Sequence, residues 1–176
     1  MQKSLFRYSL IGFIFVSILG SLSHFIYKWS GYNIVAAMFC PVNESVWEHL
    51  KLLFFPYLIW SIAEYRKLIG ENPNTKGILL CKLIGAVTGM VTIVTFFYTY
   101  TGIIGKSIEI VNILSFFIGT GTAFITDNLL IKQNKLKYDN LAIAGFISIT
   151  AVFIIFTFAP PLIPLFKDPI TSIYGI

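Results

Sequence analysis

The chain has 176 residues, of which 56% are hydrophobic and 12% charged, with a net charge of +5 and a mean hydropathy of +0.80. Soluble domains carry about 25% charged residues, and a soluble chain of this length cannot hide so much apolar surface in one core. The composition therefore excludes a soluble globular protein and indicates a protein surrounded by lipid. Lipid leaves helices or closed barrels, and long unbroken apolar runs favour helices.

Five apolar runs follow one another along a single domain, each near the roughly 20 residues that a membrane-spanning helix needs. They cover residues 5–27, 46–65, 77–103, 108–130 and 141–159, and an apolar, proline-rich tail follows over residues 160–176. The sequence thus predicts an all-α polytopic membrane protein, a bundle of about five transmembrane helices. Gly85 and Gly89 form a G-x-x-x-G pair in the third run, which predicts the close approach of another helix.

The positions of lysine and arginine predict an N-terminus inside and a C-terminus outside. Nine basic residues then fall on the inner side and four on or near the outer side, as the positive-inside rule requires. The inner nine are Lys3, Arg7, Arg66, Lys67, Lys76, Lys82, Lys132, Lys135 and Lys137, and the outer four are Lys28, Lys51, Lys106 and Lys167. Because these charges encode topology, we expect a lipid bilayer and no nucleic acid as the partner. Cys40 and Cys81 fall near opposite surfaces, so no disulfide joins them.

An unusual polar segment lies at the outer start of the second span. Four ionisable residues occur within eight positions, directly before an apolar run: Glu44, Glu48, His49 and Lys51. Charges so close to hydrocarbon are costly and rarely idle. A structural interpretation covers part of the segment, since Ser45 and Glu48 form a capping box and Trp47 suits the membrane interface. That interpretation does not explain Asn43 or His49.

The predicted topology brings His24, at the outer end of the first span, to the same side as this segment. Two histidines and a carboxylate are a usable ligand set for zinc or a similar divalent transition metal. We expect His24, His49 and Glu44 as ligands, with Glu48 as the catalytic acid–base that works on metal-activated water. The roles of Glu44 and Glu48 are interchangeable at this stage, so either carboxylate is a candidate for catalysis. A metal-free pocket for a small ligand or ion is the alternative.

Further residues are expected to bind a ligand around the same site. They are Asn43 and Lys51 in the polar segment, Tyr98 at the outer end of the third span, and Asp168 in the tail. The tail combines proline with apolar residues, which makes free solvation unfavourable. We expect it to fold back over the outer mouth of the bundle, which would bring Asp168 and Tyr174 near the histidines.

Polar residues at the inner ends of the spans have simpler expected roles. Glu64 is predicted to form a surface ion pair with the basic residues that follow it, and Asp127 to lie at a solvated helix end. Lys82 is expected to snorkel to the interface. Thr88, Thr92, Thr95 and Thr99 form one helical stripe, which either hydrogen-bonds between helices or lines the pocket.

The segment Pro-Val-Asn-Glu-Ser-Val-Trp-Glu-His at residues 41–49, with Phe55 and Pro56 after it, resembles the signature of an uncharacterised family of small bacterial membrane proteins. The residues around His24 and the closing Asp168-Pro169 and Tyr174-Gly175 pairs fit the same resemblance, which covers nearly the whole chain. It implies a multi-pass protein of the bacterial plasma membrane and implies no activity.

Three functions remain open at this stage. The first is a metal-dependent hydrolase or transferase that acts on a lipid or envelope substrate at the outer leaflet. The second is a small transporter or channel that uses the same cluster as a gate and needs a polar route to Glu64 or Asp127. The third is a non-catalytic membrane subunit that docks a partner protein through the Gly85 and Gly89 face or through a tryptophan-rich interface.

Overall fold

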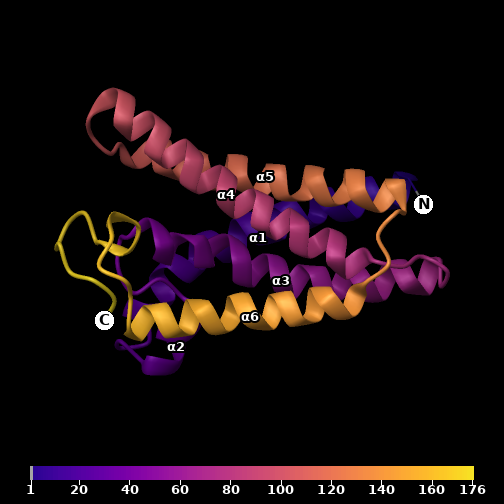
Figure 1. Cartoon of the computed structure of the whole chain (residues 1–176), viewed down its shortest axis with the longest axis horizontal. Helices are drawn as coiled ribbons and strands as arrows, with labels where there is room; N and C mark the ends of the chain where they lie inside the picture. Colours follow the sequence, from indigo (N-terminus) through magenta and orange to yellow (C-terminus); the bar gives the residue numbers. More distant parts are fainter. Residues whose placement is uncertain (1) are drawn as a thin grey trace.

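The structure, a computed structural model, describes residues 2–176, with side chains from Leu5 onward, and is helical throughout its length (Figure 1). Its described residues contain no strand apart from a single bridge between Lys167 and Tyr174. The elements are α1 (Gln2–Trp29), α2 (Ile34–Phe39), α3 (Val46–Glu71), α4 (Ile78–Ile104), α5 (Glu109–Gln133), α6 (Asp139–Phe158) and the short 3-10 helix η1 (Pro164–Phe166). The predicted all-α fold is confirmed.

Within the described residues, four helices are long and apolar enough to cross a membrane: α1 from Leu5, α4, α5 and α6. Their outward faces carry large apolar side chains, such as Ile18 and Ile147, which are 58% and 64% exposed. Water would disfavour such a surface, whereas lipid accepts it. The chain is therefore a multi-pass membrane protein.

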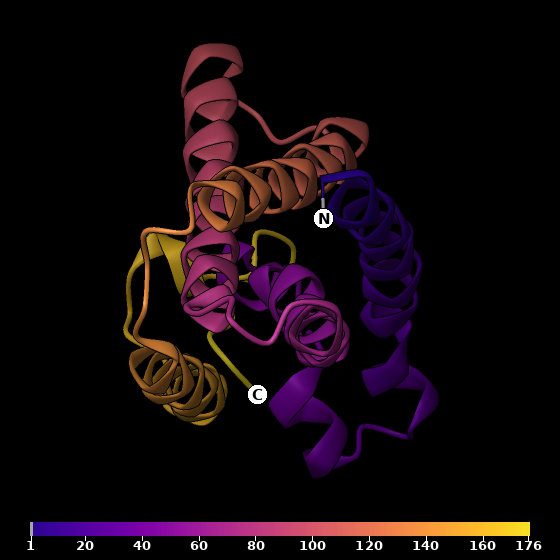
Figure 2. The ribbon, with the colours of Figure 1, turned by 90° about the vertical axis from the view of Figure 1, so that its right-hand side faces the viewer.

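Helix α3, the remaining long helix, lies between the others in the end-on view (Figure 2). It packs against α1, α4, α5, α6 and η1. Glu48, Lys51 and Glu64 make α3 more polar than the other four long helices, and α3 is not apolar enough to be counted with them as a candidate span. These three side chains are buried inside the bundle, at most 2% exposed, so they do not face lipid. That α3 is a fifth span stays a prediction, and its buried polar groups are compatible with it because they lie inside the bundle and not against lipid.

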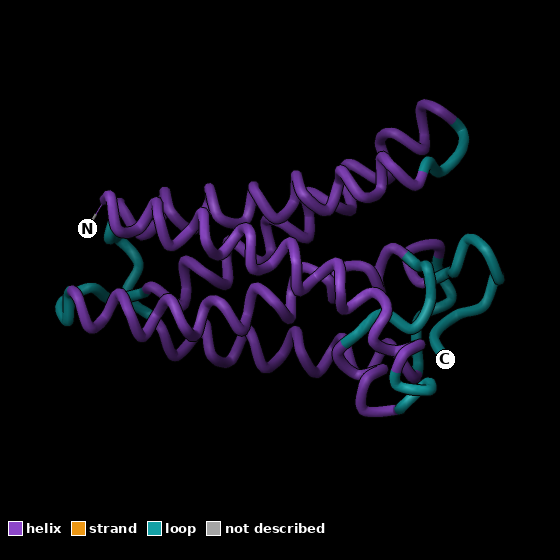
Figure 3. The backbone as a smooth tube through the Cα atoms, turned by 180° about the vertical axis from the view of Figure 1, so that it is seen from behind, coloured by secondary structure: helices purple, strands orange, loops and turns teal. Residues whose placement is uncertain are grey.

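The tail, the short helices α2 and η1 and the loops next to them gather at one end of the bundle, which we call the tail end (Figure 3). Asn33 caps α2, a helix that the sequence pattern does not predict. Cys40 and Cys81 are both free, as expected. At the tail end, Ile176 N–H donates to Thr157 O at 3.3 Å, and Asn43 Nδ2 donates to Gly175 O at 2.9 Å. The tail thus folds back onto the bundle, as predicted.

Glycines bring α4 and α5 into backbone contact, as the G-x-x-x-G pair predicts. A Cβ atom built at Gly89 would lie 2.7 Å from Gly119 O, and one built at Gly85 would lie 2.7 Å from Ala123 O. Both distances are too short for any side chain, so the two helices could not pack this closely with larger residues.

Gly89→Ala is expected to lower thermal stability in detergent, whereas Gly102→Ala is expected to leave it unchanged or raise it slightly. A Cβ at Gly89 overpacks a helix contact, which typically costs about 1–3 kcal/mol. Gly102 lies on the same helix, and its Cβ would meet nothing within 4 Å. Thermal unfolding of the two variants measures the difference. Equal stability would contradict the close α4–α5 contact.

A second close contact joins α1 to α3. Pro56 has no N–H, so it cannot bond to Leu52 O, the carbonyl one turn earlier. A Cβ built at Gly20 would lie 2.5 Å from that same oxygen. The two helices therefore pack closely through Gly20, one turn before His24.

Candidate metal centre

Three potential metal ligands converge at the tail end of the bundle. His24 Nε2 lies 3.2 Å from His49 Nε2, and Glu44 Oε2 lies 3.5 Å from His24 Nε2 and 3.3 Å from His49 Nε2. No other set of three or more histidine, cysteine or acidic side chains in the described part of the chain gathers its ligand atoms so closely. The prediction that His24, Glu44 and His49 come together is therefore met in the structure.

Each ligand comes from a different element. His24 is near the end of α1, where Gly20 holds that helix close to α3. Glu44 is in the loop before α3, and its backbone N–H lies 3.4 Å from Asp168 Oδ2 in the tail. His49 is in the first turn of α3, which Ser45 caps by accepting from Glu48 N–H. The cluster thus depends on packing between helices, on a helix cap and on the tail.

A hydrogen bond between the His49 ring and the backbone determines which ring nitrogen is available to bind a metal. Its Nδ1 lies 2.8 Å from Ser45 O, and a carbonyl can only accept, so Nδ1 carries the proton. In the neutral ring Nε2 then carries the lone pair, and it is Nε2 that faces His24 and Glu44. Metal-ligating histidines typically bond their other nitrogen to a carbonyl in this way.

The charge of Glu44 also suits a metal. When Nε2 of each ring carries a proton, hydrogen bonds from His24 and then His49 hold the pKa of the Glu44 carboxyl well below its usual range, although partial burial opposes this effect. A metal ion would take the place of those protons. The carboxylate is therefore ionised at neutral pH and needs no deprotonation before it binds a cation. The two histidines together with this carboxylate form a neutral-nitrogen and anionic-oxygen donor set that zinc and similar ions accept.

The cluster is open to the surroundings of the protein. The side chains of His24, Glu44 and His49 are 31%, 42% and 30% exposed. Structural zinc sites are closed by four protein ligands, whereas catalytic sites have three and leave one position for water or substrate. The three ligands and their exposure match the second type.

Glu48, the predicted acid–base, lies on another face of α3 and points into the protein. Its Oε2 accepts from Lys51 Nζ at 2.7 Å and from Val42 N–H at 3.0 Å, and its Oε1 accepts from Thr157 Oγ1 at 3.2 Å. It is 2% exposed. Successive side chains on a helix differ by about 100° in direction, so Glu48 and His49 point to different sides of α3. Glu48 is thus buried, with both carboxylate oxygens hydrogen-bonded, and it is not one of the three candidate ligands.

Lys51, predicted to bind a ligand, is fully buried beside Glu48. Its ammonium donates to Ala37 O at 2.9 Å, Thr157 Oγ1 at 2.6 Å and Glu48 Oε2 at 2.7 Å. Three donors have three close acceptors, so no proton remains for a ligand. The ion pair of Lys51 and Glu48 therefore connects α2, α3 and α6 at the tail end.

The other residues predicted to bind a ligand have different positions. Asn43 and Asp168 lie beside the cluster, where Asn43 Oδ1 accepts from Ser45 N–H at 2.9 Å. Asp168 is 3% exposed. Burial raises its pKa, but backbone N–H groups, first those of Ile170 and Thr171, outweigh burial and lower it overall. Both side chains hydrogen-bond to backbone groups and do not face an open site.

Tyr98 is 40% exposed on the half of α4 that leans away from α1 and α3, and its ring packs on Phe97 (Figure 1).

A second cluster contradicts the simple roles expected for three polar residues. Lys82 Nζ lies 2.5 Å from Glu64 Oε2 and 2.7 Å from Asp127 Oδ2, with all three side chains fully buried. Glu64 is therefore not in a surface ion pair, Asp127 is not at a solvated end, and Lys82 does not snorkel. A sequence signal did exist, because Tyr57, Trp60 and Glu64 share one face of α3 at helical spacing. Tyr57 Oη donates to Asp127, and Trp60 Nε1 donates to Glu64.

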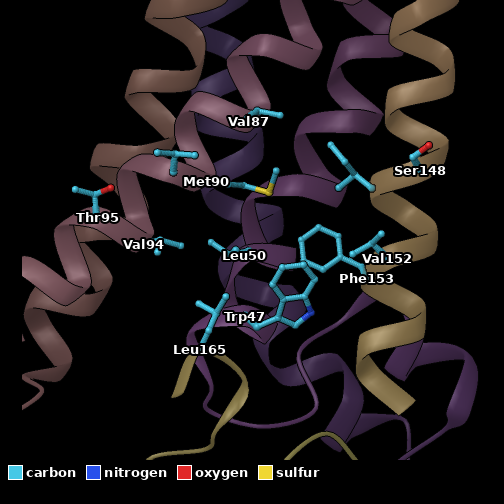
Figure 4. A pocket seen from close by; sticks show the side chains of 12 residues that line it. Trp47, Leu50, Val87, Met90, Val94, Thr95, Ser148, Val152, Phe153 and Leu165 are labelled. Atoms are coloured by element: carbon cyan, nitrogen blue, oxygen red, sulfur yellow. The ribbon is translucent and has the colours of Figure 1, made fainter. Parts of the chain in front are cut away.

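An apolar groove of about 420 Å³ opens between α4 and α6 (Figure 4). Its lining includes Trp47, Met90, Val94 and Phe153. Trp47 packs on Phe153 and Phe166, whereas His49, two residues later, faces α1. The groove and the histidine cluster thus lie on different sides of α3.

Thr88 and Thr92 donate hydrogen bonds to carbonyls of their own helix, which accounts for two members of the threonine stripe.

Neither the curated proteins nor the solved structures contain a match to the chain. The model of a family of unknown function, DUF6512, matches residues 1–176. The expected membership of an uncharacterised family is thereby confirmed, and the chain belongs to the DUF6512 family.

Proposed function

We propose that this protein is a metal-dependent hydrolase or transferase of the bacterial plasma membrane, with His24, Glu44 and His49 as the ligands of a zinc-like ion. The observation that carries the proposal is the convergence of two Nε2 atoms and one carboxylate oxygen within 3.5 Å of one another. Two nitrogen lone pairs and a carboxylate repel at such distances unless a proton or a cation lies between them, and one shared metal ion would fill that place for all three atoms. The backbone partner of His49 Nδ1 supports the same assignment.

The proposed reaction uses water at the open position of the ion. Three protein ligands would leave a fourth position for water or substrate, and a zinc-like ion held there would act as a Lewis acid and lower the pKa of its bound water to about 7. Glu48 is bound to Lys51, so we assign it a structural role and do not retain it as the acid–base. Glu44 would remain a ligand of the ion.

The substrate class follows from the position of the site. The cluster lies at the tail end of a bundle whose sides face lipid, and its side chains are about one-third exposed. The ends of membrane-spanning helices meet the interfacial region of a bilayer, where the ester and phosphate groups of lipids lie. We therefore propose a lipid or a lipid-linked envelope compound as substrate, at the outer leaflet that the basic residues predict.

Transport is a weaker alternative because apolar residues separate the two polar regions. Between His49 and Tyr57 on α3 lie Leu50, Leu53 and Phe54, which are at most 4% exposed. They belong to an apolar core with Val16, Phe116 and Phe153, contributed by other helices. A transporter needs a polar route through that layer. The subunit alternative has no specific observation in its favour.

The proposal is tested by the metal content of protein purified in detergent without a polyhistidine tag. We expect about one transition-metal ion per chain after zinc is supplied and excess is washed away. His24→Ala and His49→Ala are each expected to lose nearly all bound metal, because two remaining ligands hold the ion poorly. Lys28→Ala is the matched control, since Lys28 is exposed at the same end of α1.

Two outcomes would overturn the proposal. Wild-type protein that binds no metal has no metal centre, and the cluster is then a metal-free binding site. Full metal content in both folded histidine variants places the ion elsewhere. Circular dichroism and size-exclusion chromatography establish that each variant is folded before its metal is measured.

Asp168→Ala is expected to weaken metal affinity about 10–100-fold while leaving the stoichiometry at saturating metal unchanged. Asp168 holds the tail and accepts from the backbone N–H of Glu44, and supporting groups of this kind typically contribute that much. A competition titration with a zinc chelator measures the affinity. An unchanged affinity would show that the tail does not help to position Glu44.

A further inference from the structure

The buried cluster of Lys82, Glu64 and Asp127 has no part in the proposed metal chemistry. It joins α3, α4 and α5 through one ammonium that bonds to two carboxylates, at 2.5 Å and 2.7 Å. Tyr57 Oη donates to Asp127 Oδ2, and Trp60 Nε1 donates to Glu64 Oε2 at 3.0 Å. All three charged side chains are completely buried.

The formal charges of this cluster do not balance. Two ionised carboxylates and one ammonium leave one negative charge in excess. Apolar residues close the cluster from both directions along the bundle: Leu53 and Phe124 belong to one buried core, and Leu68 and Ile131 to the other. An uncompensated charge in such surroundings is strongly disfavoured, and buried groups normally gain or lose a proton instead.

Two oxygen atoms of the cluster have no partner. Glu64 Oε1 and Asp127 Oδ1 are buried and accept no hydrogen bond from any described residue, whereas Oε2 and Oδ2 each accept two. A buried carboxylate oxygen without a donor is costly. A proton on one of these atoms would remove both the excess charge and one unpaired acceptor.

The surrounding groups do not supply the missing positive charge. The titratable neighbours are Tyr57 on α3 and Cys81 on α4, which are neutral when protonated and can only add negative charge. Asp139, at the start of α6, accepts from the N–H groups of Gly77 and Leu79. Towards α1, Asn128 of α5 donates to Ser9 Oγ, and both side chains are uncharged. Among the described residues Lys82 is thus the sole cation of the cluster.

We propose that Glu64 and Asp127 form a proton-binding site that holds one proton per chain, shared by the two carboxyl groups. The protonated site contains one ammonium, one carboxylate and one carboxylic acid, and is neutral. Release of the proton to water leaves a net negative charge between α3, α4 and α5. Protonation is thereby linked to the packing of these three helices.

Infrared spectroscopy of the detergent-purified protein tests this site, because a carboxylic acid has a carbonyl band that a carboxylate lacks. We expect such a band in the wild type at neutral pH. Glu64→Gln and Asp127→Asn should each lose the band completely. Removing either group leaves one carboxylate and one ammonium, which balance without a proton. Glu109→Gln, at an exposed position on α5, is the control and should keep the band.

The other outcomes overturn the proposal. The absence of the band in the wild type means that both groups are ionised. A band that survives in both variants belongs to another residue, and a band lost in only one variant is not shared. If neither variant folds, the wild type alone decides: the band must disappear reversibly as the pH is raised. A band that does not respond to pH shows a proton that is locked in place.

Discussion

Replacing Lys82 with methionine is expected to destabilise the helix bundle by about 3–5 kcal/mol, the usual cost of removing one partner from a buried ion pair. Methionine approximates the length of the lysine side chain but leaves Glu64 and Asp127 facing each other without a cation. Both carboxyl groups are completely buried, so water cannot replace the lost ammonium. We expect a large drop in the thermal unfolding temperature and a poor yield of folded protein.

A compensating variant separates this electrostatic effect from a loss of packing. The triple substitution of Lys82→Met, Glu64→Gln and Asp127→Asn removes all three charges and keeps their approximate volumes. It is expected to recover most of the lost stability, because replacing a buried ionic group by neutral residues is often close to neutral in free energy. Lys106→Met, in the exposed loop between α4 and α5, should have little effect. A Lys82→Met protein as stable as Lys106→Met would contradict the role of Lys82.

The helical fold could be predicted because lipid imposes simple requirements on a sequence. Long apolar runs mark the helices, and the observed ends differ from the predicted spans by only a few residues in α4 and α5. Helix α3 is the exception: it continues to Glu71, six residues past the predicted end of the second span. Its extra turns explain the error over Glu64, which is interior to the helix and not at its surface end.

The cluster of His24, Glu44 and His49 was predictable in part. Topology alone places His24, Glu44 and His49 at one end of the molecule, and Gly20 and the cap at Ser45 then bring their side chains into contact. The functions of Glu48 and Lys51 were not predictable from position, because α2 and Thr157 supply their partners. Those partners are distant in sequence, and no periodicity signals them. The same reason hides the pairing of Lys82 with Asp127, 45 residues later.

Gly20→Val is expected to weaken metal binding although it leaves all three ligands in place. A Cβ at Gly20 would lie 2.5 Å from Leu52 O and 2.7 Å from the ring of Phe116, so α1 must move away from α3. His24 is one turn further along α1, and its Nε2 would move away from that of His49. We expect the affinity for zinc to fall at least about tenfold, as happens when groups that position ligands are disturbed.

Ser21→Val is the matched control for this change. It adds the same β-branched side chain at the next residue of α1, on an exposed face, and should retain wild-type affinity. Overpacking at Gly20 is also expected to lower stability by about 1–3 kcal/mol, so affinity is measured at a temperature where the variant is fully folded. A folded Gly20→Val protein with undiminished affinity would mean that the α1–α3 contact does not set the spacing of the histidines. Loss of affinity would instead show that the missing side chain of Gly20, which is not itself a ligand, helps to determine whether the site forms.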